Sequence, residues 1–202
     1  MLTGQARDQR REGQGGARRL EFDGPRPPGR PIEQRAGRGG NLSVREDLVV
    51  RRVLIFGRGG AGKSTLARRL GEMLQLPVVE LDKVYWRADG SPTPVAAWQA
   101  AQKHLVAGEA WILDGDLGPG DVVEPRLRAA DTIIVLDLAA YQCAWRVLRR
   151  SRERTDFWRW MLWWRQRSLP RLNLAIQRYA PTAAVVRLHS TREIEEFLRS
   201  VT

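Results

Sequence analysis

A glycine-rich loop that ends in a Lys-Ser pair is the segment whose residue types and spacing most directly indicate chemistry. Residues 57–65 read Gly-Arg-Gly-Gly-Ala-Gly-Lys-Ser-Thr, which satisfies the pattern G-x-x-x-x-G-K-[ST]. An apolar run at 51–56 precedes the loop, and apolar residues at helical spacing follow it from Leu66 to Leu74. A strand, a loop and a helix therefore succeed one another as this motif requires, and the sequence predicts a binding site for the phosphates of a nucleotide.

The motif assigns roles to individual groups. Backbone N–H groups of the loop are expected to converge on phosphate oxygens at the positive end of the following helix. Lys63 should reach the β- and γ-phosphates, and the hydroxyl of Ser64 should ligate Mg²⁺. ATP and Mg²⁺ are the expected ligands, and the predicted nucleotide-binding residues are Gly57, Gly59, Gly60, Ala61, Gly62, Lys63, Ser64 and Thr65.

Three aspartates follow apolar segments: Asp82, Asp114 and Asp137. Ligands of parallel α/β sheets bind outside the carboxyl ends of strands, so these carboxylates are candidate site residues. We predict that Asp114 shares Mg²⁺ with Ser64, and we prefer it to Asp137 because Gly115 permits a close approach of the backbone. Asp82 is expected to hold or deprotonate a phosphoryl acceptor, with a turn or helix-capping role as the alternative.

The segment 141–171 holds nine Arg, two acidic residues and five of the eight Trp. Phosphoryl transfer develops negative charge that Arg side chains can stabilise, which predicts an Arg-rich lid. A solvated cationic face, a stacking surface for nucleic acid and an amphipathic helix on an anionic membrane are the alternatives. The candidates are Arg149, Arg150, Arg165, Arg167 and Arg171, of which the first four are predicted to be catalytic.

Further apolar runs predict a parallel sheet. Strands are expected at 77–81, 110–113, 132–136 and 183–188, with helices at 94–106 and 191–200. This alternation is typical of a three-layer α/β/α domain in which helices cover both faces of the sheet. We place that domain at 48–202.

Composition excludes several classes of protein. The net charge is +11, and one Cys and two His allow neither a disulfide framework nor a structural zinc site. No apolar run of about 18 residues and no signal-peptide core is present, so a cytoplasmic protein is expected. Residues 1–47 are rich in Arg, Gly and Pro and are predicted to be a disordered tail. A nucleic-acid-binding arm, or translation that begins near Val49, are the other interpretations.

The region from about Arg51 to Val201 resembles the bacterial P-loop proteins known as DNA topology modulation proteins, which are similar to adenylate and shikimate kinases. The resemblance rests on the glycine loop, on Leu81-Asp82 with Trp86, and on the segments 111–115, 130–137, 146–150 and 187–190. It implies a five-stranded parallel sheet in the order 2-3-1-4-5, as in nucleoside-monophosphate kinases. A helical insert after the second strand and an Arg-rich helical lid after the fourth are also implied. Where this family usually has Asn-Tyr-Gly, the chain has Asp116-Leu117-Gly118, which adds a negative charge.

These observations predict an ATP-dependent phosphotransferase that moves the γ-phosphoryl group to a small acceptor. The acceptor is expected to be a nucleoside monophosphate or another small hydroxyl or phosphate compound, and the protein a monomer or weak dimer. A DNA-associated ATPase or regulator that uses the Arg/Trp-rich segment is the main alternative. A nucleotide-binding protein that has lost efficient transfer is a third, and Asp116 is its motivation. No membrane partner is expected.

Overall fold

The computed structural model describes residues 33–35, 50–118, 121–150 and 155–201. Its centre is an all-parallel sheet in the order β1-β6-β5-β2-β4-β3. The strands are β1 (Glu33–Arg35), β2 (Arg52–Gly57), β3 (Val78–Glu80), β4 (Trp111–Asp114), β5 (Thr132–Leu136) and β6 (Ala184–Leu188). The five strands from β2 to β6 lie in the predicted order 2-3-1-4-5, which confirms the P-loop kinase fold class.

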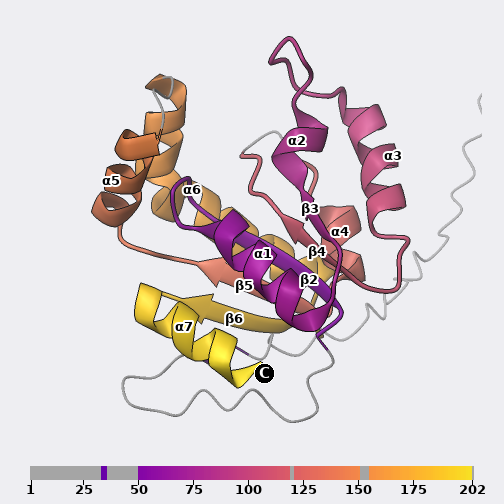
Figure 1. Cartoon of the computed structure of the whole chain (residues 1–202). Helices are drawn as coiled ribbons and strands as arrows, with labels where there is room; N and C mark the ends of the chain where they lie inside the picture. Colours follow the sequence, from indigo (N-terminus) through magenta and orange to yellow (C-terminus); the bar gives the residue numbers. More distant parts are fainter. Residues whose placement is uncertain (1–32, 36–49, 119–120, 151–154, 202) are drawn as a thin grey trace, which may run out of the picture.

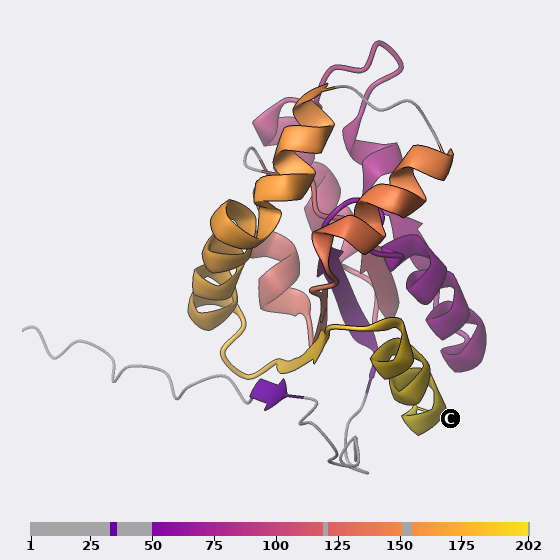
Figure 2. The same cartoon turned by 90° about the vertical axis from the view of Figure 1, so that its left-hand side faces the viewer.

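Helices cover both faces of this sheet, as the sequence predicted (Figure 1, Figure 2). They are α1 (Lys63–Leu74), α2 (Leu81–Tyr85), α3 (Val95–Leu105), α4 (Glu124–Ala129), α5 (Ala140–Arg150), α6 (Thr155–Tyr179) and α7 (Thr191–Ser200). Figure 2 shows α1 and α7 on one side of the sheet and α4 and α6 on the other. Every residue of β4 and β5 is buried, because a strand between two helical layers exposes neither face to water.

Two apolar clusters form the core, one on each face of the sheet. Leu66 and Leu70 of α1 pack with Phe197 of α7 on one face. Leu127 of α4 and Ile176 of α6 pack on the other. The alternation of side chains along each strand supplies both clusters, since neighbouring residues point to opposite faces.

Two helical segments extend beyond the carboxyl edge of the sheet. Helices α2 and α3 form the insert expected after β3, and α5 with α6 occupies the place of the predicted lid after β5. Helix α6 runs for 25 residues and contains Pro170. Among the described residues, no helix is long and apolar enough to cross a membrane.

Strand β1 was not expected from the sequence. Its three residues, Glu33–Arg35, pair in parallel with Val185, Val186 and Arg187 of β6. The sequence analysis placed them in a tail without regular structure, and here they add a sixth strand at the free edge of β6. The rest of the predicted tail up to residue 47 lies outside the described residues.

Candidate functional site

The glycine loop connects the carboxyl end of β2 to the first turn of α1. Gly60 has φ 77°, and a Cβ atom there would lie 2.5 Å from the carbonyl oxygen of Cys143, so the loop packs directly against α5. Gly62 precedes α1 in the left-handed conformation, and no side chain caps the helix. The first backbone N–H groups of α1 are therefore available to an anion, which the helix dipole also favours.

A cavity of about 590 Å³ opens over this loop. Its floor is the segment 59–66, and Glu80 and Asp82 close one side. Its other wall is formed by residues of α1, α5 and α7, namely Arg69, Arg146, Val147, Thr191, Ile194 and Glu195. An elongated ligand with phosphates at one end therefore has room for its other end between α5 and α7.

Lys63 and Ser64 line this cavity, and the buried side chain of Asp114 lies next to both. The ammonium of Lys63 donates a hydrogen bond to the carbonyl oxygen of Arg58 at 3.4 Å, within the loop itself. Asp114 ends β4, beside Ile55 of β2, and its side chain is buried. Burial raises the pKa of the Asp114 carboxyl, while a hydrogen bond from Ser64 and the charge of Lys63 act in the opposite direction.

The donor set at Ser64 and Asp114 fits Mg²⁺. Oδ1 of Asp114 is buried and has no hydrogen-bond partner among the described residues, so an oxygen ligand is left unsatisfied beside a hydroxyl. No group of three or more His, Cys, Asp or Glu side chains in the described part of the chain is placed to hold a metal by itself. This agrees with Mg²⁺, which takes one or two protein ligands and completes its shell with substrate phosphates and water.

Asp82 lies at the cavity, in the first turn of the short helix α2. The sequence analysis extended the preceding strand to Leu81, but the strand ends at Glu80 and Leu81 begins the helix. Desolvation by the cavity wall raises the pKa of Asp82, and Lys63 and a hydrogen bond from Trp86 oppose this shift. Gly115 lets the segment after β4 pack closely against Leu81, because a Cβ on residue 115 would lie 2.8 Å from Cβ of Leu81. The close approach that Gly115 permits is thus to α2.

Asp137 and Arg165 face each other at the end of β5. Nε of Arg165 lies 2.9 Å from Oδ1 of Asp137, and Nη2 donates to the Asp137 carbonyl oxygen at 3.2 Å. Nδ1 of His189 lies 3.6 Å from the other carboxylate oxygen. Arg165 ties α6 to the sheet edge through this contact, and its action on phosphates stays a prediction. Asp137 is taken up by this contact, which leaves Asp114 as the carboxylate that faces Ser64.

Among the other predicted lid arginines whose side chains are described, Arg149, Arg167 and Arg171 do not line the cavity. Arg149 lies over the ring of Trp145 at 5.5 Å, and Arg167 lies over Trp163 at 5.2 Å. The side chain of Arg150 lies outside the described residues. Arg171 is exposed on α6.

Arg146 lines the cavity and was missed as a site residue. Its Nη1 donates to the carbonyl oxygen of Ala61 at 3.5 Å, and its Nη2 donates to Oγ1 of Thr191 at 3.1 Å. A signal for it exists in the sequence: Cys143 and Val147 are buried against the loop, and Arg146 lies three residues after the first and directly before the second. Helical spacing places residues three apart on one face, which favours Arg146 but equally Arg150, three residues after Val147.

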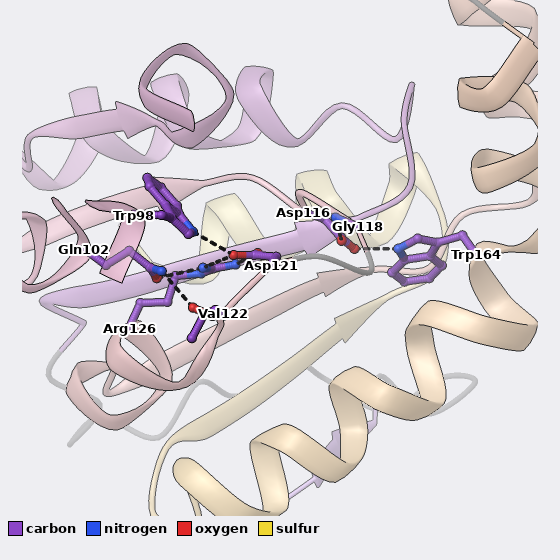
Figure 3. Close-up of polar contacts among 8 residues, drawn as sticks. All are labelled: Trp98, Gln102, Asp116, Gly118, Asp121, Val122, Arg126 and Trp164. Carbon is purple, nitrogen blue, oxygen red and sulfur yellow. Dashed lines mark hydrogen bonds and ion pairs between the residues drawn. The ribbon is translucent and has the colours of Figure 1, made fainter. Parts of the chain in front are cut away.

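A second missed residue is Arg58, the second residue of the loop. Its guanidinium lies over the ring of Trp164 in α6, with the Cζ atom 5.6 Å from the ring centroid. The indole nitrogen of Trp164 donates to Oδ2 of Asp116 at 2.5 Å, as Figure 3 shows. Oδ1 of Asp116 accepts from the backbone of Gly118 at 3.3 Å. Asp116 thus joins the segment after β4 to α6, a role that the sequence did not reveal.

A buried polar network fixes the segment that follows (Figure 3). Arg126 of α4 forms an ion pair with Asp121, and both side chains are buried. Nε1 of Trp98 in α3 donates to the same carboxylate at 3.0 Å, and Gln102 accepts from Arg126 at 2.8 Å. Trp98 also packs edge-to-face on Tyr85 of α2, with ring centroids 5.2 Å apart. The insert is therefore anchored to the loop after β4, and Asp82 is carried by an ordered support.

The strand order, the loop after β2 and the Ser64–Asp114 pair together define the class of the chain as a P-loop nucleotide-binding fold of the nucleoside-monophosphate-kinase type. The chain is 31% identical over 120 residues to a shikimate kinase of Bradyrhizobium diazoefficiens and 32% identical over 120 residues to one of Nitrobacter winogradskyi. Each alignment covers 54% of this chain, and 57% and 55% of the respective relatives. The chain thus spans little more than half the length of the curated relatives that it matches.

Solved structures with a similar arrangement include a sugar kinase from Janibacter sp. HTCC2649, with 19% identity and a TM-score of 0.48 over 75% of this chain and 94% of that one. A shikimate kinase from Acinetobacter baumannii in complex with shikimate has 15% identity and a TM-score of 0.48, over 76% and 92% of the two chains. No family model matches the chain. The resemblance to DNA topology modulation proteins stays a prediction.

Proposed function

We propose that this protein is a P-loop phosphotransferase that binds ATP with Mg²⁺ and transfers the γ-phosphoryl group to a small acceptor. The observation that carries the proposal is the meeting of Lys63, Ser64 and the unsatisfied Asp114 carboxylate under a cavity that Asp82 borders. A cation, two potential Mg²⁺ ligands and a candidate acceptor-binding carboxylate around one space support the proposal. The shikimate kinases aligned with about half of the chain support the same class of reaction.

Different groups of the chain bind the nucleotide, the metal ion and the acceptor. The loop amides and Lys63 hold the β- and γ-phosphates, and Arg146 with Thr191 borders the space for the nucleoside. Ser64 and Asp114 would hold Mg²⁺, which neutralises phosphate charge when bound. Asp82 orients the acceptor hydroxyl and accepts its proton, a role that suits a carboxyl whose pKa lies above its ordinary value.

The acceptor belongs to this proposal as a small hydroxylated compound or a nucleoside monophosphate. Because the aligned relatives are shikimate kinases, shikimate is the first hydroxy acid to test. The alternative, a DNA-associated ATPase, is kept because Trp145 and Trp163 are half exposed or more and each has an arginine over its ring. Such side chains can stack on bases.

The test is ADP formation by the full chain with Mg-ATP. The panel contains nucleoside monophosphates, shikimate, gluconate and other small polyols, and duplex DNA. Lys63→Ala is the inactive variant, and Lys103→Ala, an exposed lysine of α3, is its matched control. A rate increase with one small acceptor that disappears in Lys63→Ala supports the proposal. Stimulation by DNA alone, or undiminished turnover in Lys63→Ala, contradicts it.

A further inference from the structure

Arg58 is a buried cation directly within the phosphate loop. Its side chain is 2% exposed. Its Nε atom has no hydrogen-bond partner, and the described part of the chain contains no ion pair to its guanidinium. The loop motif leaves the residue after its first glycine unspecified, so it does not require an arginine at position 58. A large charged residue at this place therefore needs a physical reason.

The contacts around Arg58 compensate its charge only in part. The nearby carboxylate, Asp137, already binds Arg165 at 2.9 Å and faces His189 at 3.6 Å. The ring of Trp164 provides a cation–π contact, which returns only part of the cost of taking a guanidinium out of water. Arginine does not deprotonate under ordinary conditions, so the charge persists when the side chain is buried.

Trp164 holds this charge in a fixed place. Its side chain has no exposed surface, and its indole N–H is bound by Asp116. Arg165, the next residue, is bound to Asp137 on the opposite side of β2 in the sheet. Consecutive residues of α6 are thus attached to the ends of β4 and β5, which flank the strand that carries the loop. The ring of Trp164, held in this way, gives the guanidinium of Arg58 a fixed contact.

We propose that Arg58 is a second fixed cation of the phosphate site, held beneath the loop by Trp164, and that it strengthens the binding of polyphosphate. The inference rests on the proposed function in assigning a nucleotide to the loop. Lys63 lines the cavity over the loop, whereas the guanidinium of Arg58 does not line it and lies over the ring of Trp164. A bound polyanion offsets a positive charge that the protein alone leaves unpaired, because electrostatic attraction is stronger where water is excluded.

The test measures binding of three probes to the full chain by calorimetry: inorganic tripolyphosphate, Mg-ATP and adenosine. Arg58→Met removes the charge and keeps most of the volume, Arg58→Gln is a second neutral variant in case Met prevents folding, and Arg58→Lys keeps the charge. Arg178→Met is the matched control, since Arg178 also lies over an aromatic ring, that of Tyr179, but at the far end of α6.

We expect the neutral variants to bind tripolyphosphate and Mg-ATP about tenfold more weakly and adenosine unchanged. Arg58→Lys should recover most of the loss, and Arg178→Met should bind like the original protein. Raising the salt concentration should narrow the difference between the original protein and Arg58→Met. A merely structural arginine would give a lower melting temperature with unchanged tripolyphosphate affinity, and that result would overturn the proposal. Equal weakness of Arg58→Lys and Arg58→Met would also overturn it.

The proposed function can fail separately. If the original protein binds tripolyphosphate through Arg58 but transfers phosphate to no acceptor, the phosphotransferase assignment is lost and the role of Arg58 remains. If it transfers phosphate and Arg58→Met binds both anions normally, the role of Arg58 is lost and the assignment remains.

Discussion

Nε1 of Trp164 donates a 2.5 Å hydrogen bond to Oδ2 of Asp116, and this contact joins the middle of α6 to the segment that follows β4. The carboxyl of Asp116 is removed from water by this packing, which raises its pKa despite the hydrogen bonds from Trp164 and Gly118 and the nearby charge of Lys63.

Asp116→Asn should change how stability depends on pH. Because the folded pKa of Asp116 lies above the unfolded value of 3.8, the folded state binds more protons in that window. The carboxyl's contribution is then fully present below the unfolded pKa and is lost as pH rises through the folded pKa. Asp116→Asn keeps an acceptor for Trp164 and removes the titration, so its stability relative to the original protein should increase as pH rises through this window. Urea unfolding at several pH values measures the difference.

Asp89→Asn is the control for this measurement, with the opposite sign. Asp89 lies in an exposed turn, and its hydrogen bonds with Ser91 lower its pKa. Its contribution is present above the unfolded pKa, so Asp89→Asn should lose relative stability as pH rises. Identical pH slopes for the two variants would contradict the environment described for Asp116.

Asp114→Asn should remove the dependence of nucleotide binding on Mg²⁺. The buried carboxylate oxygen that now lacks a partner would be replaced by a neutral, weaker ligand beside Ser64. The comparison is ATP affinity with Mg²⁺ and with EDTA. Burial raises the pKa of Asp114. As the pH is lowered, the original protein should therefore lose its Mg²⁺ dependence at a higher pH than it would with an ordinary aspartate. Asp137→Asn is the control, and a larger loss of Mg²⁺ dependence there would reverse the assignment.

Arg146→Ala should weaken ATP binding by roughly tenfold, since its guanidinium lines the cavity and binds both Ala61 and Thr191. Arg149→Ala, on the same helix, removes a side chain that lies over exposed Trp145 and should change the affinity little. Fluorescence or calorimetric titration distinguishes the two. An equal effect of both variants would mean that Arg149 moves to the phosphates on binding.

Arg126→Ala should lower the free energy of unfolding by about 3–5 kcal/mol, because it leaves the buried carboxylate of Asp121 unpaired. Arg128→Ala is the matched control on the same helix. It removes a largely exposed pair with Glu124 and should cost less than about 1 kcal/mol. Denaturant titration of both variants gives the comparison, and similar losses would mean that water reaches the Asp121 network.

The fold was predictable because the strands are buried between two layers. Such strands appear in the sequence as apolar runs. The loop motif also requires a strand before it and a helix after it, which identified β2 and α1. Strand β1 was not predictable, since Glu33–Arg35 has no apolar pattern and its pairing is made through backbone groups. Backbone hydrogen bonding to a free edge leaves no signature in side-chain composition.

The site was predictable only where the chain itself sets the geometry. Lys63 and Ser64 follow the loop, so their placement at the cavity needs no information about distant segments. The contacts of the arginines in α5 and α6 were harder to predict. Composition indicates how many arginines there are, but it does not say where each side chain points. Arg165 binds Asp137, which lies 28 positions earlier in the sequence, and Arg58 meets Trp164 across more than a hundred residues.

The close contact between Gly60 and α5 makes Cys143 a natural reporter. It is the chain's one cysteine, its side chain is fully buried, and its backbone carbonyl lies against the phosphate loop. Burial also raises the pKa of its thiol, so little reactive thiolate is present. A thiol reagent can modify this position only when the core cluster around Cys143 opens. The labelling rate therefore measures that opening without any substitution in the protein.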